Sequence, residues 1–143
     1  TIIGNEADNV IVGLPGADIL TGGMGSDRFV YRNAFDSFLG DSRPYYDHIT
    51  DFNPAYDVIQ LPFASSSHVK SLDALTELTD HSVSNAFIAS GIESHDIVMF
   101  EFGERTFIIA NDEIADYSSH DDILIEITGA DLSSITESSF AGV

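Results

Sequence analysis

Apolar residues recur at every ninth position along the N-terminal part of the chain. They are Ile2, Ile11, Leu20, Phe29 and Phe38. Each follows a turn rich in glycine or acidic residues, so the pattern predicts three-residue strands that point one apolar side chain inward. A repeat this short indicates a coil of stacked strands and turns, with two repeats completing one coil.

Two segments beyond residue 38 alternate polar and apolar positions as half-buried strands do. They are DHITDF (47–52) and YDVIQL (56–61). The residues between them, Asn53, Pro54 and Ala55, have the composition of a turn. The pattern therefore predicts an antiparallel strand pair.

The C-terminal part is predicted to be mostly β. SLDALTELTD (71–80) has leucines at helical spacing behind Ser71, which predicts a short helix. The remaining patterned segments predict strands, with a hairpin turn at Gly103–Glu104. These segments are AFIAS (86–90), DIVMFEFG (96–103), RTFIIAND (105–112) and DILIEIT (122–128).

The turns of the nine-residue repeat carry glycines and carboxylates in fixed columns. Gly22 aligns with Gly13 and Gly4, and Asp27 with Asp18 and Asn9. Glycine permits positive φ and close approach of neighbouring backbones, which favours a tight turn. Aspartate is a hard oxygen ligand, suited to a cation that also takes several backbone carbonyls.

Because two repeats complete a coil, carboxylates two repeats apart are expected to stack on the same side. On that geometry Asn9 pairs with Asp27, and Asp18 pairs with Asp36. Stacked acidic turns repel one another unless a cation lies between them. The alternative is an ordinary series of Gly-Asp turns in a β-protein without metal.

The segment GGMGSDRFV (22–30) resembles the RTX nonapeptide repeat, G-G-x-G-x-D-x-U-x with U apolar, at every fixed position. Residues 13–21 place Leu14 where the second glycine belongs. Residues 4–12 place Asn5, Ala7 and Asn9 at fixed positions, and a local slip would make Asp8 the ligand instead. The RTX repeat forms a calcium-loaded parallel β-roll.

The resemblance implies a set of calcium ligands. Turn carbonyls would come from Asn5, Ala7, Leu14, Gly16, Gly23 and Gly25, and side chains from Asn9, Asp18, Asp27 and Asp36. The order GGMGSDRFVY, DS, DHITDF, YDVIQL is also similar to the C-terminal domain of serralysin-type secreted metalloproteases. That similarity implies one more ligand, Asp47.

The expected fold class is therefore all-β. A short parallel β-roll over residues 1–39 runs into a small antiparallel β-sandwich over 40–143, with one short helix. We expect residues 1–143 to form a single C-terminal module of a longer protein, because Thr1 already lies inside a repeat. The tail, from Arg105 to Gly129, also resembles the ends of cyanobacterial RTX proteins.

Composition supports a cation-binding protein and argues against other partners. The formal net charge is −19, which disfavours nucleic acid and anionic membranes. The sequence has no cysteine and no apolar run long enough to span a bilayer. Asn111, Asp112, Asp121 and Asp122 form a second candidate cation site, with capping of a loop as the favoured alternative.

An enzymatic function is not expected. The five histidines have spacings that match no zinc motif, and no nucleophile elbow or phosphate-binding loop is present. In an alternating strand, His48 faces away from Asp47.

The predicted function is a calcium-binding module of a secreted bacterial protein. It would fold on Ca²⁺ binding outside the cell and support type I secretion of a passenger domain that precedes it. The alternative is a structural or adhesive cell-surface module stiffened by calcium.

Overall fold

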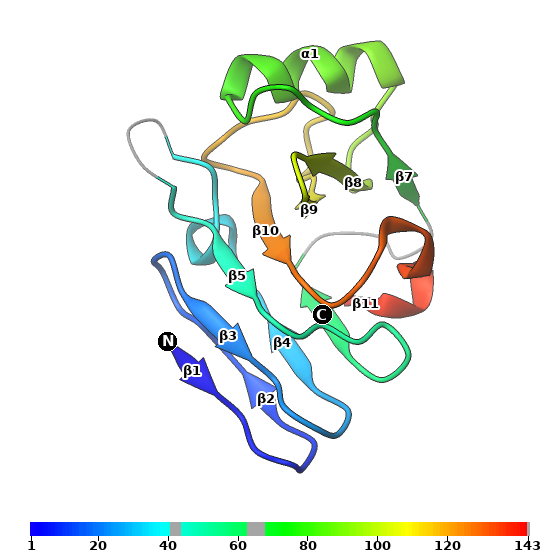
Figure 1. Cartoon of the computed structure of the whole chain (residues 1–143). Helices are drawn as coiled ribbons and strands as arrows, with labels where there is room; N and C mark the ends of the chain where they lie inside the picture. The colour runs from blue at the N-terminus through cyan, green and yellow to red at the C-terminus, as the bar shows by residue number, and fades with distance from the viewer. Residues whose placement is uncertain (41–43, 63–67, 143) are drawn as a thin grey trace.

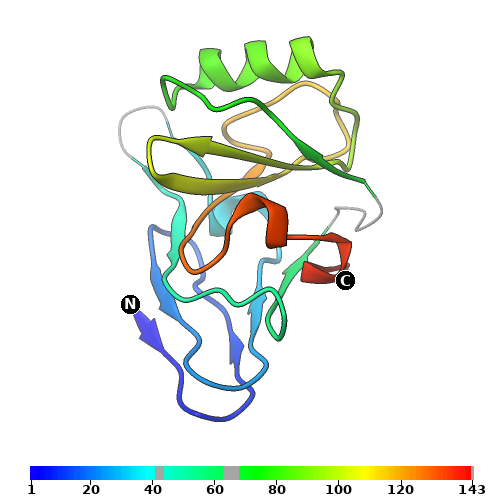
Figure 2. The same cartoon turned by 45° about the vertical axis from the view of Figure 1, so that its right-hand side comes forward.

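The short repeat strands are shared between two sheets, because successive strands along the chain alternate from one sheet to the other. The computed structural model describes residues 1–40, 44–62 and 68–142. One sheet has the strand order β1-β3-β5-β10-β9-β8-β7, and the other has the order β11-β6-β4-β2. Helix α1 and the first coil lie at opposite ends of the molecule (Figures 1 and 2).

The strands and the α-helix have the following bounds. The N-terminal strands are β1 Ile2–Ile3, β2 Val10–Ile11, β3 Ile19–Thr21, β4 Arg28–Val30, β5 Asp47–Ile49 and β6 Val58–Leu61. The later elements are β7 Val69–Ser71, α1 Asp80–Ser90, β8 Ile97–Phe102, β9 Arg105–Ala110, β10 Ile123–Ile127 and β11 Phe140–Gly142. The 3-10 helices of the described residues are η1 Ala34–Asp36, η2 Leu132–Ser134 and η3 Glu137–Ser139.

The apolar column of the repeat lines the space between the two sheets, as predicted, up to Phe29. Leu20 pairs in register with Ile2, and Phe29 pairs in parallel with Ile11. Phe38 does not continue the column. The chain enters η1 after β4, and Phe38 is only half-buried, in an isolated bridge with Tyr45.

The column instead resumes in the strands β5 and β6. Ile49 pairs with Leu20, and Ile59 pairs with Phe29. The predicted antiparallel pairing of β5 with β6 is therefore wrong, since the two strands lie in different sheets and pair in parallel with β3 and β4. Alternation of side chains identifies a half-buried strand but does not specify its partner.

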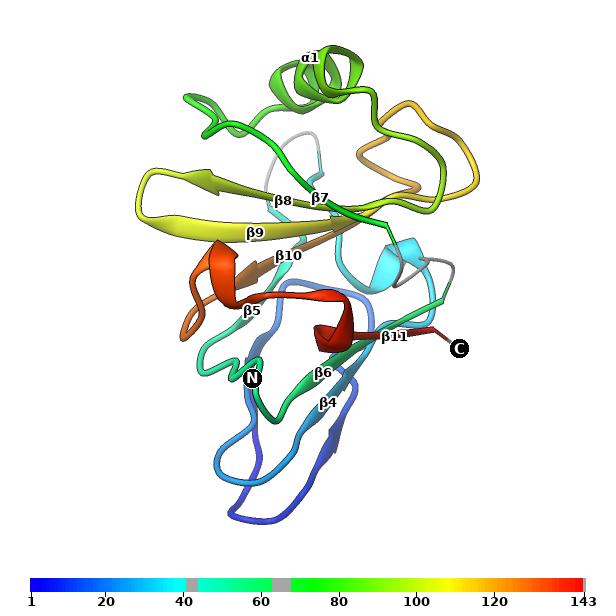
Figure 3. The same cartoon turned by 90° about the vertical axis from the view of Figure 1, so that its right-hand side faces the viewer.

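The C-terminal strands extend both sheets of the roll. β8 and β9 form the predicted hairpin, in which Gly103 at the turn has φ of +64°. β10 pairs antiparallel with β9 and parallel with β5, while β11 pairs parallel with β6 (Figure 3). The all-β class is confirmed, and β8, β9 and β10 are the strands that pair antiparallel among the described residues.

Helix α1 lies later in the chain than the predicted helix. The expected helix at 71–80 is wrong, and so is the expected strand at 86–90, because helix α1 spans Asp80–Ser90. The Thr79 side chain accepts a hydrogen bond from the Ser82 N–H at the N-terminus, and Gly91 with φ of +62° ends the helix. The leucines of 71–80 pack from an extended segment, where Leu72 is buried.

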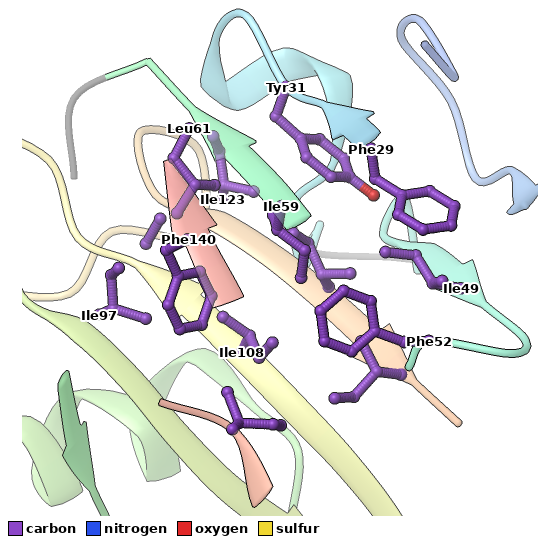
Figure 4. Packing of buried hydrophobic residues seen from close by; sticks show 14 of the residues in the cluster. Phe29, Tyr31, Ile49, Phe52, Ile59, Leu61, Ile97, Ile108, Ile123 and Phe140 are labelled. Atoms are coloured by element: carbon purple, nitrogen blue, oxygen red, sulfur yellow. The ribbon is translucent and has the colours of Figure 1, made fainter. Parts of the chain in front are cut away.

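Buried apolar side chains form two clusters. The larger one fills the space between the two sheets and joins the repeat strands to the C-terminal strands (Figure 4). Phe29 and Phe52 meet there with ring centroids 6.3 Å apart. The smaller cluster lies between α1 and the outer face of β8, β9 and β10. No helix among the described residues has the length and apolar character needed to cross a membrane.

Candidate metal centre

The stacked turns at the ends of the roll are joined by one repeated hydrogen bond. The Asn9 N–H donates to Asp27 Oδ1 at 2.9 Å, and the Asp18 N–H donates to Asp47 Oδ1 at 2.8 Å. The Asp27 N–H donates to Asp57 Oδ1 at 3.0 Å. Each residue of the carboxylate column thus binds the aspartate of the turn one coil later. One oxygen of each aspartate is used, and the other remains for a second partner.

The first candidate site lies between turn 4–9 and turn 22–27, and we call it the Asp27 site. Asp27 is 2% exposed, and its Oδ2 accepts no hydrogen bond. This oxygen lies 2.4 Å from the position that a β-carbon would take at Gly22, so only glycine fits there. A buried carboxylate oxygen without a donor is costly unless a cation or a proton is present.

Backbone carbonyls of turn 4–9 face the next turn across the Asp27 site. A β-carbon at Gly23 would lie 2.4 Å from the Asn5 carbonyl oxygen, and one at Gly25 would lie 2.9 Å from that of Ala7. Gly23 and Gly25 have φ of +98° and +108°. The glycines therefore allow both the turn conformation and the close stacking of the two turns.

Asn9 closes its own turn rather than leaving its side chain free. Its Oδ1 accepts from the Asn5 N–H at 2.8 Å, and its Nδ2 donates to the Ala7 carbonyl at 2.7 Å. The register of β2 against β4 places Asn9 over Asp27 without a slip. Asp8 instead accepts from the Ser26 N–H at 2.8 Å.

The second candidate site lies where turn 13–18 meets the start of β5, and we call it the Asp47 site. Asp47 is fully buried, and no donor lies within hydrogen-bond distance of its Oδ2, although the buried Tyr31 hydroxyl is close enough to this carboxylate to lower its pKa. A β-carbon at Gly13 would lie 2.7 Å from that oxygen and 3.4 Å from Asp18 Oδ2. Burial, together with the charges of Asp18 and Asp36, raises the pKa of Asp47 to about 7.

The turn of the Asp47 site keeps the backbone of the repeat despite its departure from the glycine pattern. Leu14 has φ of +68° and Gly16 has φ of +144°. A leucine in the left-handed region is strained, which indicates that the stacking geometry dictates this conformation.

Asp36 does not stack on Asp18 as predicted. It lies in η1, where its Oδ2 accepts from the Arg32 N–H at 2.9 Å, and Asp47 takes the expected place over Asp18. The reason is that the chain leaves the repeat after β4, so the next coil follows 29 residues after Asp18. Asp36 stays near, since its charge contributes to the raised pKa of Asp47. Its buried Oδ1 accepts no hydrogen bond.

The sequence did not lead us to expect a structural role for two acidic residues of the third coil, Asp51 and Asp57. Asp51 accepts from the N–H groups of Gly22 and Gly23 at 2.8 and 2.9 Å. Asp57 Oδ2 accepts from the Asn53 N–H at 2.8 Å, and burial raises its pKa, with the charges of Asp27 and Asp51 adding. Asp51 therefore joins the last turn to turn 22–27, whereas Asp57 Oδ2 closes the last turn itself.

A sequence signal for Asp57 was available. Asp57-Val58-Ile59 repeats the aspartate, any residue, apolar order of Asp27-Arg28-Phe29, at an interval of 30 residues instead of 18. A search restricted to the nine-residue period misses it.

The acidic loop before β10 is held by its own backbone. Asp122 accepts from the Asp112 and Ser118 N–H groups at 2.8 and 2.7 Å, and burial raises its pKa to about 7. Asp112 accepts from the Ile114 N–H at 2.7 Å, and Asn111 Nδ2 donates to the Glu93 carbonyl at 2.9 Å. This arrangement supports the capping interpretation over a second cation site.

The turn sites suit a hard cation that takes carbonyl oxygens together with carboxylates. Within residues 1–40, 44–62 and 68–142, no three histidine or acidic side chains converge as ligands of one ion. Backbone carbonyls therefore have to complete the coordination, as they do for Ca²⁺. The unpaired oxygens of Asp27, Asp47 and Asp36 supply the negative charge. His48 lies on the other face of β5, with its Nε2 2.8 Å from Thr128 Oγ1.

Comparison with known proteins agrees with this chemistry. Residues 1–34 match the family described as the RTX calcium-binding nonapeptide repeat (4 copies). No curated protein matches the sequence. The chain is similar to the solution structure of the AlgE6R2 subunit from the Azotobacter vinelandii mannuronan C5-epimerase. The TM-score is 0.53 and the identity 16%, over 99% of this chain and 91% of that chain. At this identity the similarity shows the fold alone.

Proposed function

We propose that the chain folds on Ca²⁺ binding outside the cell and supports type I secretion of a larger exoprotein, since residues 1–34 match the RTX calcium-binding nonapeptide repeat. The observation that carries the proposal is the pair of buried carboxylate oxygens without a hydrogen-bond donor, Asp27 Oδ2 beside Gly22 of its own turn and Asp47 Oδ2 beside Gly13 of the stacked turn. A divalent cation at each position would supply the missing partner.

Calcium would be held by carbonyls and carboxylates of the stacked turns. The proposed ligands are the residues expected from the repeat, namely Asn5, Ala7, Asn9, Leu14, Gly16, Asp18, Gly23, Gly25, Asp27, Asp36 and Asp47. Asn9 contributes least, because its amide is already engaged within its own turn. Asp36 would act beside Asp47, not in the stack over Asp18.

Calcium would switch the chain from an unfolded to a folded state, because the chain is strongly negative and calcium is far more concentrated outside the cell than in the cytosol. With a net charge of −19, self-repulsion opposes a compact state. Extracellular calcium modules have dissociation constants of about 10⁻⁴ to 10⁻³ M, far above cytosolic calcium. Each site at ten times its dissociation constant stabilises the fold by about 1.4 kcal/mol. The segment would stay unfolded during export and fold once outside.

The decisive experiment is a calcium titration followed by far-UV circular dichroism, with magnesium as the control cation. We expect a β-sheet spectrum to develop at millimolar Ca²⁺ and not at equal Mg²⁺. A fold already complete in chelator contradicts the switch. For export, the chain is attached to a reporter passenger beside a type I transporter. Loss of the reporter from the medium when the chain is removed supports the secretion role.

A structural or adhesive role is the second candidate, and an exposed aromatic group favours it. Phe35 is 59% exposed and packs edge-on against Phe38, which stacks on Tyr45 with ring centroids 5.0 Å apart. Aromatic surface of this kind is enriched at protein interfaces. Phe35→Ser separates the two roles: reduced cell-surface attachment with unchanged export supports adhesion.

A further inference from the structure

Ser37 connects the Asp47 site to the C-terminal half of the protein. It is fully buried, follows Asp36 directly, and caps η1. Its Oγ accepts from the Asp47 N–H at 2.8 Å and donates its own hydrogen to the Leu124 carbonyl. The Leu124 N–H donates to the Ser37 carbonyl at 3.0 Å. The Ser37 side chain thus links the backbone of Asp47 to the backbone of Leu124 in β10.

The register of β10 against β5 places the Ser37 contacts next to Asp47. Ile125, the residue after Leu124, pairs in parallel with Asp47 itself. β5 therefore lies between the repeat strand β3 and the C-terminal strand β10 (Figure 1). The hydroxyl therefore holds the backbone of Asp47, the first residue of β5, at the position where this strand pairs with β10.

From these contacts we propose that Ser37 is a positioning residue for calcium at the Asp47 site and couples occupancy of that site to docking of β10. The proposal rests on the calcium-binding function proposed above. Ser37 provides no ligand in it. The hydroxyl fixes Asp47 directly and Asp36 through the adjacent backbone, and both side chains have a buried oxygen without a hydrogen-bond partner. Groups that orient metal ligands typically change affinity by about 10–100-fold when removed.

The coupling is testable because Tyr31 reports on this site. Burial raises the pKa of Tyr31, and the charge of Asp47 and an interaction of its carboxylate with the Tyr31 hydroxyl add to the shift, so Tyr31 lies close to Asp47. Tb³⁺ can replace Ca²⁺ and emits when a nearby tyrosine is excited. The part of the Tb³⁺ luminescence that disappears in Tyr31→Phe is assigned to the Asp47 site, and the rest to other sites.

The test compares Ser37→Ala with Ser139→Ala, which removes another fully buried serine hydroxyl, in η3. We expect Ser37→Ala to weaken the Tyr31-dependent Tb³⁺ binding about tenfold while the remaining signal keeps its affinity. In the same protein, hydrogen exchange of the Leu124 amide should accelerate at saturating Ca²⁺. Ser139→Ala should change neither quantity.

The measurements distinguish failure of the Ser37 proposal from failure of the proposed calcium-binding function. If wild type binds neither Ca²⁺ nor Tb³⁺, the calcium function is wrong. If wild type binds and Ser37→Ala keeps the Tyr31-dependent affinity within twofold, the positioning role is wrong. If Ser37→Ala does not fold even at saturating Ca²⁺, Ser37→Cys decides instead, since a thiol of similar size is only a weak hydrogen-bond donor and acceptor. Intermediate affinity supports positioning, and unchanged affinity overturns it.

Discussion

Asp47 accepts the backbone N–H of Asp18 at 2.8 Å although the two residues are 29 apart in sequence. The regular repeat forms the equivalent bond between Asn9 and Asp27 at a separation of 18. The chain therefore leaves the repeat, makes η1 and a loop, and returns to the stacking position of the next coil. The carboxylate at the return point, not the one at the regular period, completes the turn stack.

Asp47→Asn is expected to act in opposite directions with and without calcium. Asparagine keeps an oxygen for the Asp18 N–H but removes a buried charge that Asp18 and Asp36 repel. In chelator the substitution should therefore favour the folded state by about 1 kcal/mol, so the variant should fold at a lower concentration of a stabilising osmolyte than wild type. In calcium it should bind the ion at least about tenfold more weakly, because an anionic ligand is lost. Osmolyte-induced folding in chelator and calorimetric titration measure the two effects.

Asp73→Asn is the matched control, because Asp73 is an exposed acid outside the roll. It changes the net charge by the same amount and should leave calcium affinity unchanged. Equal loss of affinity in both variants would show that the overall charge, not the Asp47 site, governs binding.

Gly25→Ala should cost more stability than Gly103→Ala. Both glycines have positive φ, at +108° and +64°. A β-carbon at Gly103 meets open space, whereas one at Gly25 lies 2.8 Å from the Ala7 carbonyl carbon of the stacked turn. Backbone strain alone costs about 1–2 kcal/mol, and the clash at Gly25 adds to it. Thermal unfolding in saturating calcium compares them, and equal losses would argue against tight stacking of the turns.

The repeat could be predicted from sequence because its signal is local and periodic. Gly22, Asp27 and Phe29 each occupy a column whose physical role follows from residue type, and the structure places them in the turn and in the core accordingly. The position of Asp36 was not predictable in the same way. The nine-residue period extends to it numerically, but the chain has already entered η1.

The partners of β5 and β6 and the position of the α-helix were predicted wrongly for a different reason. β5 and β6 have the alternation of any half-buried strand, and their parallel partners are set by contacts 29 or more residues away. Leu72, Leu75 and Leu78 have helical spacing, yet the segment lies against the hydrophobic face in extended form, with a bridge from Leu75 to Phe102. Tertiary packing outweighed a weak helical preference there.

Leu14→Gly is expected to be neutral or stabilising, although replacing leucine with glycine usually destabilises a protein. Leu14 has φ of +68° and is exposed, so it loses little packing. Relief of left-handed strain is worth about 1–2 kcal/mol, against about 0.5–1 kcal/mol of added backbone entropy in the unfolded state. Val10→Gly is the control, since Val10 is 70% exposed in a strand and should lose stability. A loss for Leu14→Gly as large as that for Val10→Gly contradicts the prediction.

The contribution of Asp122 to the stability of the calcium-loaded protein should fall as pH rises from 5 to 8. Burial raises the pKa of Asp122 from 3.8 to about 7, so the folded state favours the protonated carboxyl. The contribution is fully present below pH 3.8 and is lost as pH rises through about 7. Relative to Asp122→Asn, wild type should lose about 1–3 kcal/mol over this range. Asp116→Asn, an exposed acid of the same loop, should follow wild type. Parallel pH curves for wild type and Asp122→Asn would show that the carboxyl of Asp122 is already ionised at pH 5.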